Sequence, residues 1–104
     1  MAVLAVIKYD LRPGMAEAYV EWATANVQVQ LSVPGVVEIR SYRPIAGSSQ
    51  IVITYEFADL AAYAAWRSHP ENERVSAEAF QYCENISVEL WGPSSATPAP
   101  LRPE

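Results

Sequence analysis

The sequence predicts one α+β domain whose elements follow the order β-α-β-β-α-β. Four short segments have the β-branched composition or the alternation of strands, and two longer regions carry apolar residues at helical spacing. Turn sequences that contain proline or glycine separate these segments. The length of 104 residues is typical of one domain, and 51% apolar residues are enough for a globular core.

The first strand is expected over residues 3–9, where a β-branched run precedes the turn sequence LRPG. A helix follows over residues 14–31 and ends at the sequence SVPG, because proline cannot continue a helix and glycine permits the reversal. One helix face carries the apolar residues Met15, Ala18, Tyr19, Trp22, Ala25 and Val29. The opposite face, expected to be solvated, carries Glu17, Glu21, Thr24 and Gln28.

The second half of the chain predicts a hairpin, a divided helix and a last strand. Residues 36–43 and 50–57 alternate as two strands joined by a loop. Asp59 is a suitable N-cap for a helix over residues 60–66. After Pro70, a second helical piece is expected over residues 71–83, and residues 86–91 alternate as the fourth strand.

This order is the ferredoxin-like arrangement, a four-stranded antiparallel sheet with both helical regions on one face. The helix-facing side is expected to carry Val37, Ile39, Ile51, Ile53, Ile86, Val88 and Leu90. The other side is expected to carry Arg40, Tyr42, Val52, Thr54, Glu56, Glu89 and Trp91, and no element remains to cover it. We therefore expect a homodimer with Arg–Glu contacts across the interface; the alternative is a monomer with a hydrated sheet face.

Charge and cysteine content exclude several classes of function. The net charge of −5 and the scattered basic residues argue against a nucleic acid or an anionic membrane as partner. The apolar start MAVLAVI lacks a basic segment and is too short for a signal peptide or a membrane span. The single cysteine, Cys83, excludes an intrachain disulfide and fits a reducing compartment, so a soluble cytoplasmic protein is expected.

The main part of the chain and its C-terminal end differ in how much regular structure their sequences predict. Residues 1–92 form the expected domain, and residues 93–104 form a tail that holds four of the eight prolines without any periodicity. We expect this tail to be disordered. Cys83, next to Tyr82 in an expected helical segment, is interpreted as a small buried apolar residue rather than a nucleophile.

Two amides interrupt the apolar face of the first helix. Asn26 and Gln30 either line a cavity and donate to a ligand oxygen, or the helix ends near Ala25 and Asn26 caps it or meets water. Aromatic residues could line a flat apolar pocket, or they could fill an ordinary core. They are Tyr19, Trp22, Tyr55, Tyr63, Trp66, Phe80 and Tyr82.

His69, the only histidine, precedes Pro70, which suits the first position of a helix. His69 is therefore expected at the helix cap, with a role as general base as the alternative. Glu71 and Glu73 fit stabilisation of the helix dipole. One histidine, one cysteine and dispersed carboxylates provide no metal-ligand spacing, so no metal site is predicted.

The chain resembles the antibiotic biosynthesis monooxygenase family of dimeric α/β-barrel proteins. The matching stretches are LRPGMAEAY, SVPGVVEIRSYR and ITYEFADLAAYAAWRSHPENERV, and the likeness covers about residues 1–92. The resemblance implies a homodimer with one pocket per chain between sheet and helices. Family members that act on aromatic polyketides oxidise phenols or anthrones to quinones without flavin, haem or metal, so no cofactor is expected.

The resemblance also implies roles for individual residues. Trp66 matches the tryptophan that family members place against the substrate, and with Asn26 and Tyr55 it forms the expected catalytic set. The residues expected to bind a small aromatic substrate are Tyr19, Trp22, Tyr63, His69 and Tyr82. The leading function is thus oxygenation of a phenolic or polycyclic aromatic compound; the alternatives are a non-catalytic small-molecule binder and a cyclase or isomerase.

The sequence departs from the haem-degrading relatives of this family. Those relatives carry an asparagine on the first strand and a haem-ligating histidine about ten residues beyond the matched tryptophan. Here the first strand contains Lys8, and Ser76 stands at the position of that histidine. Haem degradation is therefore not expected.

Overall fold

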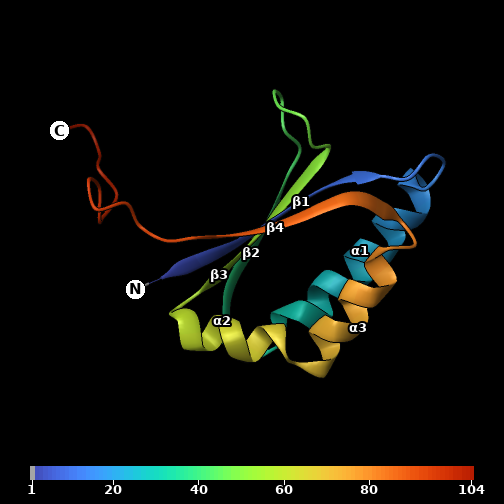
Figure 1. Cartoon of the computed structure of the whole chain (residues 1–104), viewed down its shortest axis with the longest axis horizontal. Helices are drawn as coiled ribbons and strands as arrows, with labels where there is room; N and C mark the ends of the chain where they lie inside the picture. The colour runs from blue at the N-terminus through green and yellow to red at the C-terminus, as the bar shows by residue number, and fades with distance from the viewer. Residues whose placement is uncertain (1) are drawn as a thin grey trace.

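The computed structural model describes residues 2–104. Its elements are β1 (Val3–Leu11), α1 (Ala16–Leu31), β2 (Val36–Tyr42), β3 (Ile51–Phe57), α2 (Leu60–Arg67), α3 (Pro70–Ala79) and β4 (Cys83–Trp91). The strands pair antiparallel in the order β2-β3-β1-β4, and the helices lie together on one face of the sheet (Figure 1). The predicted α+β, ferredoxin-like fold is confirmed.

The predicted break in the second helical region is confirmed and has a defined local structure. The Asp59 carboxylate accepts a hydrogen bond from the Ala62 backbone N–H at 2.9 Å, so it caps α2 as expected. Pro70 is the first residue of α3, and Nδ1 of His69 accepts from the Glu71 backbone N–H at 3.1 Å. His69 therefore occupies the predicted cap position.

The core lies between the helices and the sheet. Its buried residues are Val3, Ala5, Tyr9, Tyr19, Val33, Ile53, Tyr55, Phe57, Trp66 and Cys83. The strand residues among them alternate along β1 and β3, because successive side chains of a strand point to opposite faces. The predicted inward face of β3 is thus confirmed.

The predicted buried face of α1 is confirmed at Tyr19 but is displaced by part of a turn. Ala18 and Ala25 of that face are exposed, whereas Asn26 and Gln30 are buried. The helix also continues through Leu31, so the interpretation that it ends near Ala25 is wrong. The apolar pattern misplaces the face because the two amides find hydrogen-bond partners on other helices and can therefore be buried.

The predicted end of the last helix is also wrong. The helix ends at Ala79, and Cys83 is the first residue of β4, paired with Leu11 of β1. The backbone N–H of Arg12 also donates to the Tyr82 carbonyl at 2.8 Å. Pairing with the extended end of β1 therefore overrides the local helical pattern, while Cys83 is buried as predicted.

Two predictions about the helix-facing side of the sheet need correction. A bulge in β2 places Val36 opposite Phe57 and leaves Val37 56% exposed, so Val36 occupies the core position expected for Val37. Val88 and Leu90 pair with Ile7 and Ala5, on the predicted face. Both remain exposed, because the helices pack over the other strands and do not cover β4.

The opposite face of the sheet is uncovered in the described chain, as expected. It forms a shallow depression of about 440 Å³ lined by Leu4, Val6, Glu38, Arg40, Tyr42, Val52, Thr54, Glu56 and Trp91. Lys8 forms an ion pair with Glu89 at 3.0 Å and lies over the Trp91 ring. Residues 92–104 are exposed and run away from the helices (Figure 1), and their disorder stays a prediction.

Gly35, in the turn between α1 and β2, provides a test of this packing. Its φ is +96°, and a Cβ there would lie 3.2 Å from the Ala62 Cβ on α2. Gly47 has a φ of +116° with nothing near its missing Cβ. We predict that Gly35→Ala lowers the free energy of unfolding by about 1 kcal/mol more than Gly47→Ala, because only the first adds a contact to the backbone strain. Urea unfolding measures this; equal losses would contradict the tight approach of α2.

Candidate functional site

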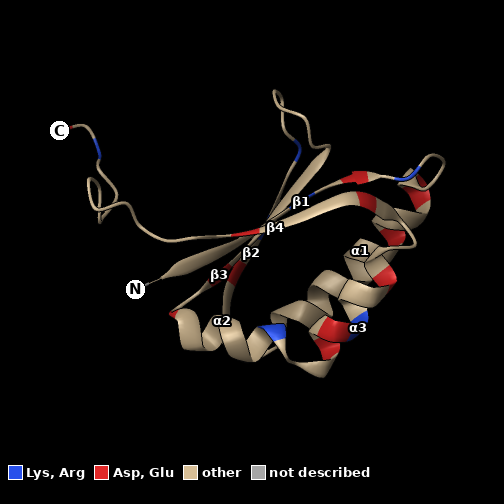
Figure 2. Cartoon of the chain, viewed as in Figure 1, with Lys and Arg blue, Asp and Glu red and all other residues tan. Residues whose placement is uncertain are grey.

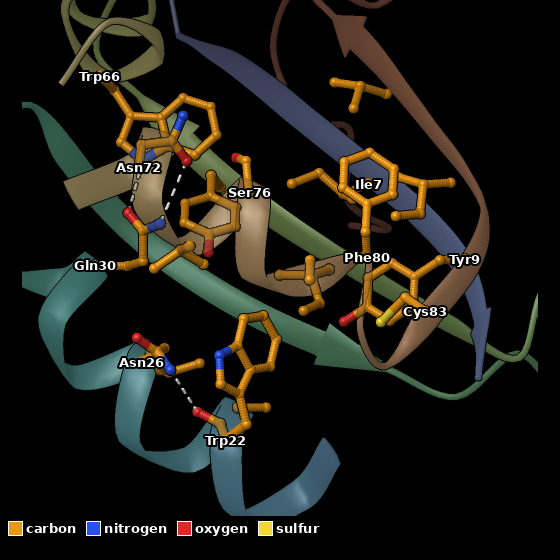
Figure 3. A pocket seen from close by; sticks show the side chains of 18 of the residues that line it. Ile7, Tyr9, Trp22, Asn26, Gln30, Trp66, Asn72, Ser76, Phe80 and Cys83 are labelled. Carbon is orange, nitrogen blue, oxygen red and sulfur yellow. Dashed lines mark hydrogen bonds between the residues drawn. The ribbon is translucent and has the colours of Figure 1, made fainter. Parts of the chain in front are cut away.

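A cavity of about 410 Å³ lies between the sheet and the three helices (Figure 3). Its volume is in the range of small-molecule sites. The residues that line it are Ile7, Tyr9, Tyr19, Trp22, Ala23, Asn26, Val27, Gln30, Ile53, Tyr55, Tyr63, Trp66, Arg67, Asn72, Val75, Ser76, Ala79, Phe80, Cys83, Ile86 and Val88. Most are aromatic or aliphatic, so the cavity suits a flat apolar molecule.

The cavity opens beside β4, on the side of the sheet that faces the helices. Phe80, at the end of α3, is 61% exposed, and Val88 of β4 is 56% exposed, yet both line the cavity. Within residues 2–104, the helices pack mainly over the other three strands, so the gap between β4 and α3 is the open side. A ligand would therefore pass between these two apolar side chains.

Trp66 forms part of the cavity wall and is held in place by Tyr55, Phe57 and Gln30. Its ring packs against Tyr55 and Phe57, with centroids 4.9 and 5.2 Å away. Its indole Nε1–H donates to Gln30 Oε1 at 3.0 Å. The indole N–H is thus already used, and Trp66 offers its apolar ring surface to a ligand.

Tyr55 provides a hydroxyl that a ligand can reach. The side chain is only 5% exposed, and its hydroxyl makes no hydrogen bond within residues 2–104. Within residues 2–104, every side-chain polar atom that is fully enclosed has a hydrogen-bond partner. The Tyr55 oxygen has none, so it is not fully enclosed and remains accessible from the cavity that Tyr55 lines. A buried hydroxyl without a protein partner is suited to a ligand oxygen.

Asn26 and Trp22 belong to a network between α1 and α3. The Asn26 amide N–H donates to the Trp22 carbonyl at 2.8 Å (Figure 3), and its Oδ1 accepts from Arg74 at 2.9 Å. Glu78 accepts from Trp22 Nε1 and from Arg74, both at 2.9 Å. The hydrogen bond from Trp22, followed by that from Arg74, lowers the pKa of Glu78. The network holds α3 against α1 and uses most of the Asn26 amide.

Tyr9 and Tyr19 form a hydroxyl pair at the β1 side of the cavity. Burial raises the pKa of each phenol, and for Tyr9 the hydrogen bond with Tyr19 adds to the increase. Both groups are therefore neutral near pH 7. They can orient a ligand oxygen but cannot serve as a base at that pH.

The electrostatics of the lining favour a ligand without positive charge. Among the described residues of the lining, Arg67 is the only charged one. Figure 2 shows acidic residues along the helices, but the described lining contains no carboxylate and no histidine. No group of three or more His, Cys, Asp or Glu side chains within residues 2–104 is arranged to hold a metal ion.

The structure brings together most of the site residues predicted from the sequence. The six that line the cavity are Tyr19, Trp22, Asn26, Tyr55, Tyr63 and Trp66. His69 and Tyr82 lie outside the lining: His69 caps α3, and Tyr82 stacks on Trp22 with centroids 5.1 Å apart. The catalytic and binding roles of all eight residues stay predictions.

Several lining residues were not predicted as site residues. Tyr9 lies two residues after Ile7 on β1, so both side chains point to the helix-facing side of the sheet. The alternation of that strand could therefore have predicted Tyr9 as a lining residue. Asn72 and Ser76 come from α3, and their placement depends on how α3 packs against α1. Sequence periodicity contains no information about that packing.

Comparison with known proteins places the chain in a family. The sequence profile of the family described as antibiotic biosynthesis monooxygenase matches residues 2–78. The chain belongs to this family. The resemblance that the sequence motifs indicated is therefore confirmed. No curated protein sequence matches the chain significantly.

Solved structures share the fold at low sequence identity. A dabb family protein with a ferredoxin-like fold from Mesorhizobium loti is 17% identical, with a TM-score of 0.80 over 90% of this chain and 98% of that one. An Arabidopsis thaliana protein is 13% identical, with a TM-score of 0.80 over 89% and 96%. A dimeric ferredoxin-like protein of unknown function from Thermobifida fusca is 10% identical, with a TM-score of 0.73 over 88% and 90%.

Within residues 2–104, no helix combines the length and the apolar character needed to cross a bilayer.

Burial of two ionisable groups in the cavity wall predicts alkaline destabilisation. Burial raises the pKa of the Cys83 thiol from 9.0 to about 11, and that of the Tyr55 phenol from 10.0 to about 12. Between these pKa values, the folded protein keeps protons that the unfolded chain loses. The contribution of the two groups to the free energy of unfolding is therefore fully present below pH 9 and is lost as the pH rises towards 12. Urea unfolding at a series of pH values should show this decline.

Two variants separate the contributions. Cys83→Ala should flatten the decline between pH 9 and 11, and Tyr55→Phe should flatten it between pH 10 and 12. A decline that neither variant changes would mean that these groups are not buried as described.

Proposed function

We propose that this protein binds a hydroxylated, flat aromatic compound in the cavity and oxygenates it to a quinone without a bound cofactor. The observation that supports this most directly is an aromatic cavity of about 410 Å³ in which the Tyr55 hydroxyl has no protein partner. Membership of the antibiotic biosynthesis monooxygenase family supports the reaction type.

The proposed reaction uses the substrate as the reductant. A methylene group flanked by aromatic rings and conjugated with a ketone loses a proton and forms an electron-rich enolate. The enolate reduces O₂; one oxygen atom becomes the new carbonyl, and the other leaves as water together with the two hydrogens of the methylene. The protein contributes a dry cavity and hydrogen bonds to the enolate oxygen.

The lining also defines what the substrate must supply. Without a carboxylate or histidine among its described residues, the cavity has no general base for neutral pH. The substrate must therefore be acidic enough to release its proton to water at the open side beside Phe80. The Tyr55 hydroxyl is the proposed donor to the enolate oxygen, and the Trp66 ring is the proposed surface for stacking.

The absence of a carboxylate or histidine from the described lining bears on the two alternative functions differently. A cyclase or isomerase must both remove a proton and return one to carbon within the pocket, and the described lining has no carboxylate or histidine to carry it. A non-catalytic binder of the same class of ligand needs only the cavity and its hydroxyl groups. Binding without turnover is therefore the second candidate.

Oxygen uptake with dithranol, a dihydroxyanthrone, tests the proposal. We predict uptake above the uncatalysed rate, with formation of the corresponding quinone, danthron. Tyr55→Phe should weaken danthron binding about 2- to 10-fold and slow uptake, because one neutral hydrogen bond is lost. Isothermal titration and an oxygen electrode provide the two measurements.

Tyr42→Phe is the matched control, because it removes the same hydroxyl from the opposite face of the sheet. Danthron binding and oxygen uptake should not change in this variant. Binding without added oxygen uptake would identify a binder, and absence of both would reject the proposed ligand class.

We also propose that two copies of the chain pair through the uncovered sheet face. The depression there mixes apolar and charged side chains, and the Thermobifida fusca structure is described as dimeric. Arg40 and Glu38 form only a loose, exposed ion pair of 3.7 Å within one chain, so both can exchange partners across an interface. The free, buried Cys83 is consistent with the reducing, cytoplasmic location that we propose.

Sedimentation equilibrium should give twice the 11.5 kDa mass of the chain. Val52→Lys, in the depression, should shift the protein towards monomer because a lysine cannot be buried there without a partner. Val20→Lys is the matched control on the exposed surface of α1, 60% exposed, and should leave the mass unchanged. A monomeric parent protein would exclude the dimer.

A further inference from the structure

One fully buried polar side chain connects all three helices. Gln30 of α1 is 1% exposed. Its Oε1 accepts from Trp66 Nε1 of α2 at 3.0 Å, and its Nε2 donates to Asn72 Oδ1 of α3 at 3.3 Å (Figure 3). Asn72 in turn donates to the carbonyl of Arg67, the last residue of α2, at 3.4 Å.

Stability alone does not require an amide at this position. Neutral hydrogen bonds contribute little net stability, and replacing all partners by apolar side chains of similar shape is often nearly neutral. Removal of one partner alone is different, because it leaves the remaining buried groups unsatisfied. The network therefore specifies one arrangement of its members.

The member that matters for the cavity is Trp66. Tyr55, Phe57 and Tyr63 pack around its ring at centroid distances of 4.9, 5.2 and 6.0 Å. These contacts are apolar and do not select one edge of the indole. The hydrogen bond to Gln30 selects one edge of the indole, because Nε1–H is the only hydrogen-bond donor of that side chain.

We propose that Gln30 is a positioning residue that fixes the orientation of the Trp66 ring and so sets the shape of the cavity wall that this ring forms. It does so through hydrogen bonds to side chains of α2 and α3, with both ends of its amide occupied. This inference rests on the proposed function only for its consequence, a preference for flat ligands.

Gln30→Met tests the proposal, because methionine keeps the length of the side chain and removes both hydrogen bonds. We predict that danthron affinity falls about 5- to 10-fold, on the scale of one lost hydrogen bond and a mobile ring. The near-ultraviolet circular dichroism of the tryptophans should also decrease. Gln28→Met, the same change at an exposed position of α1, is the matched control and should alter neither signal.

A double variant shows whether Gln30 acts through Trp66. In a Trp66→Phe background, Gln30→Met should change danthron affinity less than about twofold and leave the near-ultraviolet spectrum unchanged. Two results would overturn the proposal. One is a double variant in which the losses of danthron affinity from the two single variants add up; the other is a Gln30→Met variant with the same affinity and spectrum as Gln28→Met. If Gln30→Met does not fold, Asn72→Ala takes its place. It should lower danthron affinity in the parent protein and change it less than about twofold in the Trp66→Phe background.

Failure of the proposed function gives a different result. If the unmodified protein does not bind danthron, the function proposed above is wrong. The spectra then decide the role of Gln30: a loss of the Trp66 signal in Gln30→Met alone supports positioning, and an unchanged signal excludes it.

Discussion

The division of the second helical region at Pro70 is the constraint on which the rest of the structure depends. Proline has no N–H to donate and fixes its own φ, so α2 must end before it and α3 can begin with it. The chain then changes direction, with α2 over β1, β2 and β3 and α3 against α1. Because the helices pack mainly over β1, β2 and β3, β4 stays largely open on the helical side, and a hollow remains between it and α3.

Polar groups around the hollow fall into two sets with different roles. The amides and indole N–H groups bond to one another or to Arg74 and Glu78, and so hold the helices in place. The Tyr55 hydroxyl has no protein partner and is available to a ligand. Burial keeps the phenols neutral, which makes them donors for an anionic oxygen rather than bases. A cavity of this kind suits a reaction in which the substrate provides the electrons and the protein provides stabilisation.

Much of the fold was predictable because local patterns agree with it. A β-branched run located β1, alternation located the other three strands, and Asp59 and Pro70 located the start of α2 and of α3. The errors share a cause: each involves a residue whose place is set by a distant partner. Cys83 joins β4 because β1 extends to pair with it, and Val37 leaves the core because β2 bulges opposite β3. Trp66, Tyr55 and Asn26 line one cavity, and their roles stay predictions, whereas His69 and Tyr82 lie outside its lining.

The sequence by itself determined the order of the elements, the helix break and the family, since these depend on residue type and on spacing along the chain. Only the tertiary structure decided which groups face the cavity and which remain free to meet a ligand. A hydrogen-bond partner such as Asn72 for Gln30, or Arg74 for Asn26, is more than 40 residues away in the chain. Whether a buried polar atom is satisfied depends on atoms brought together by packing, and no local pattern records that.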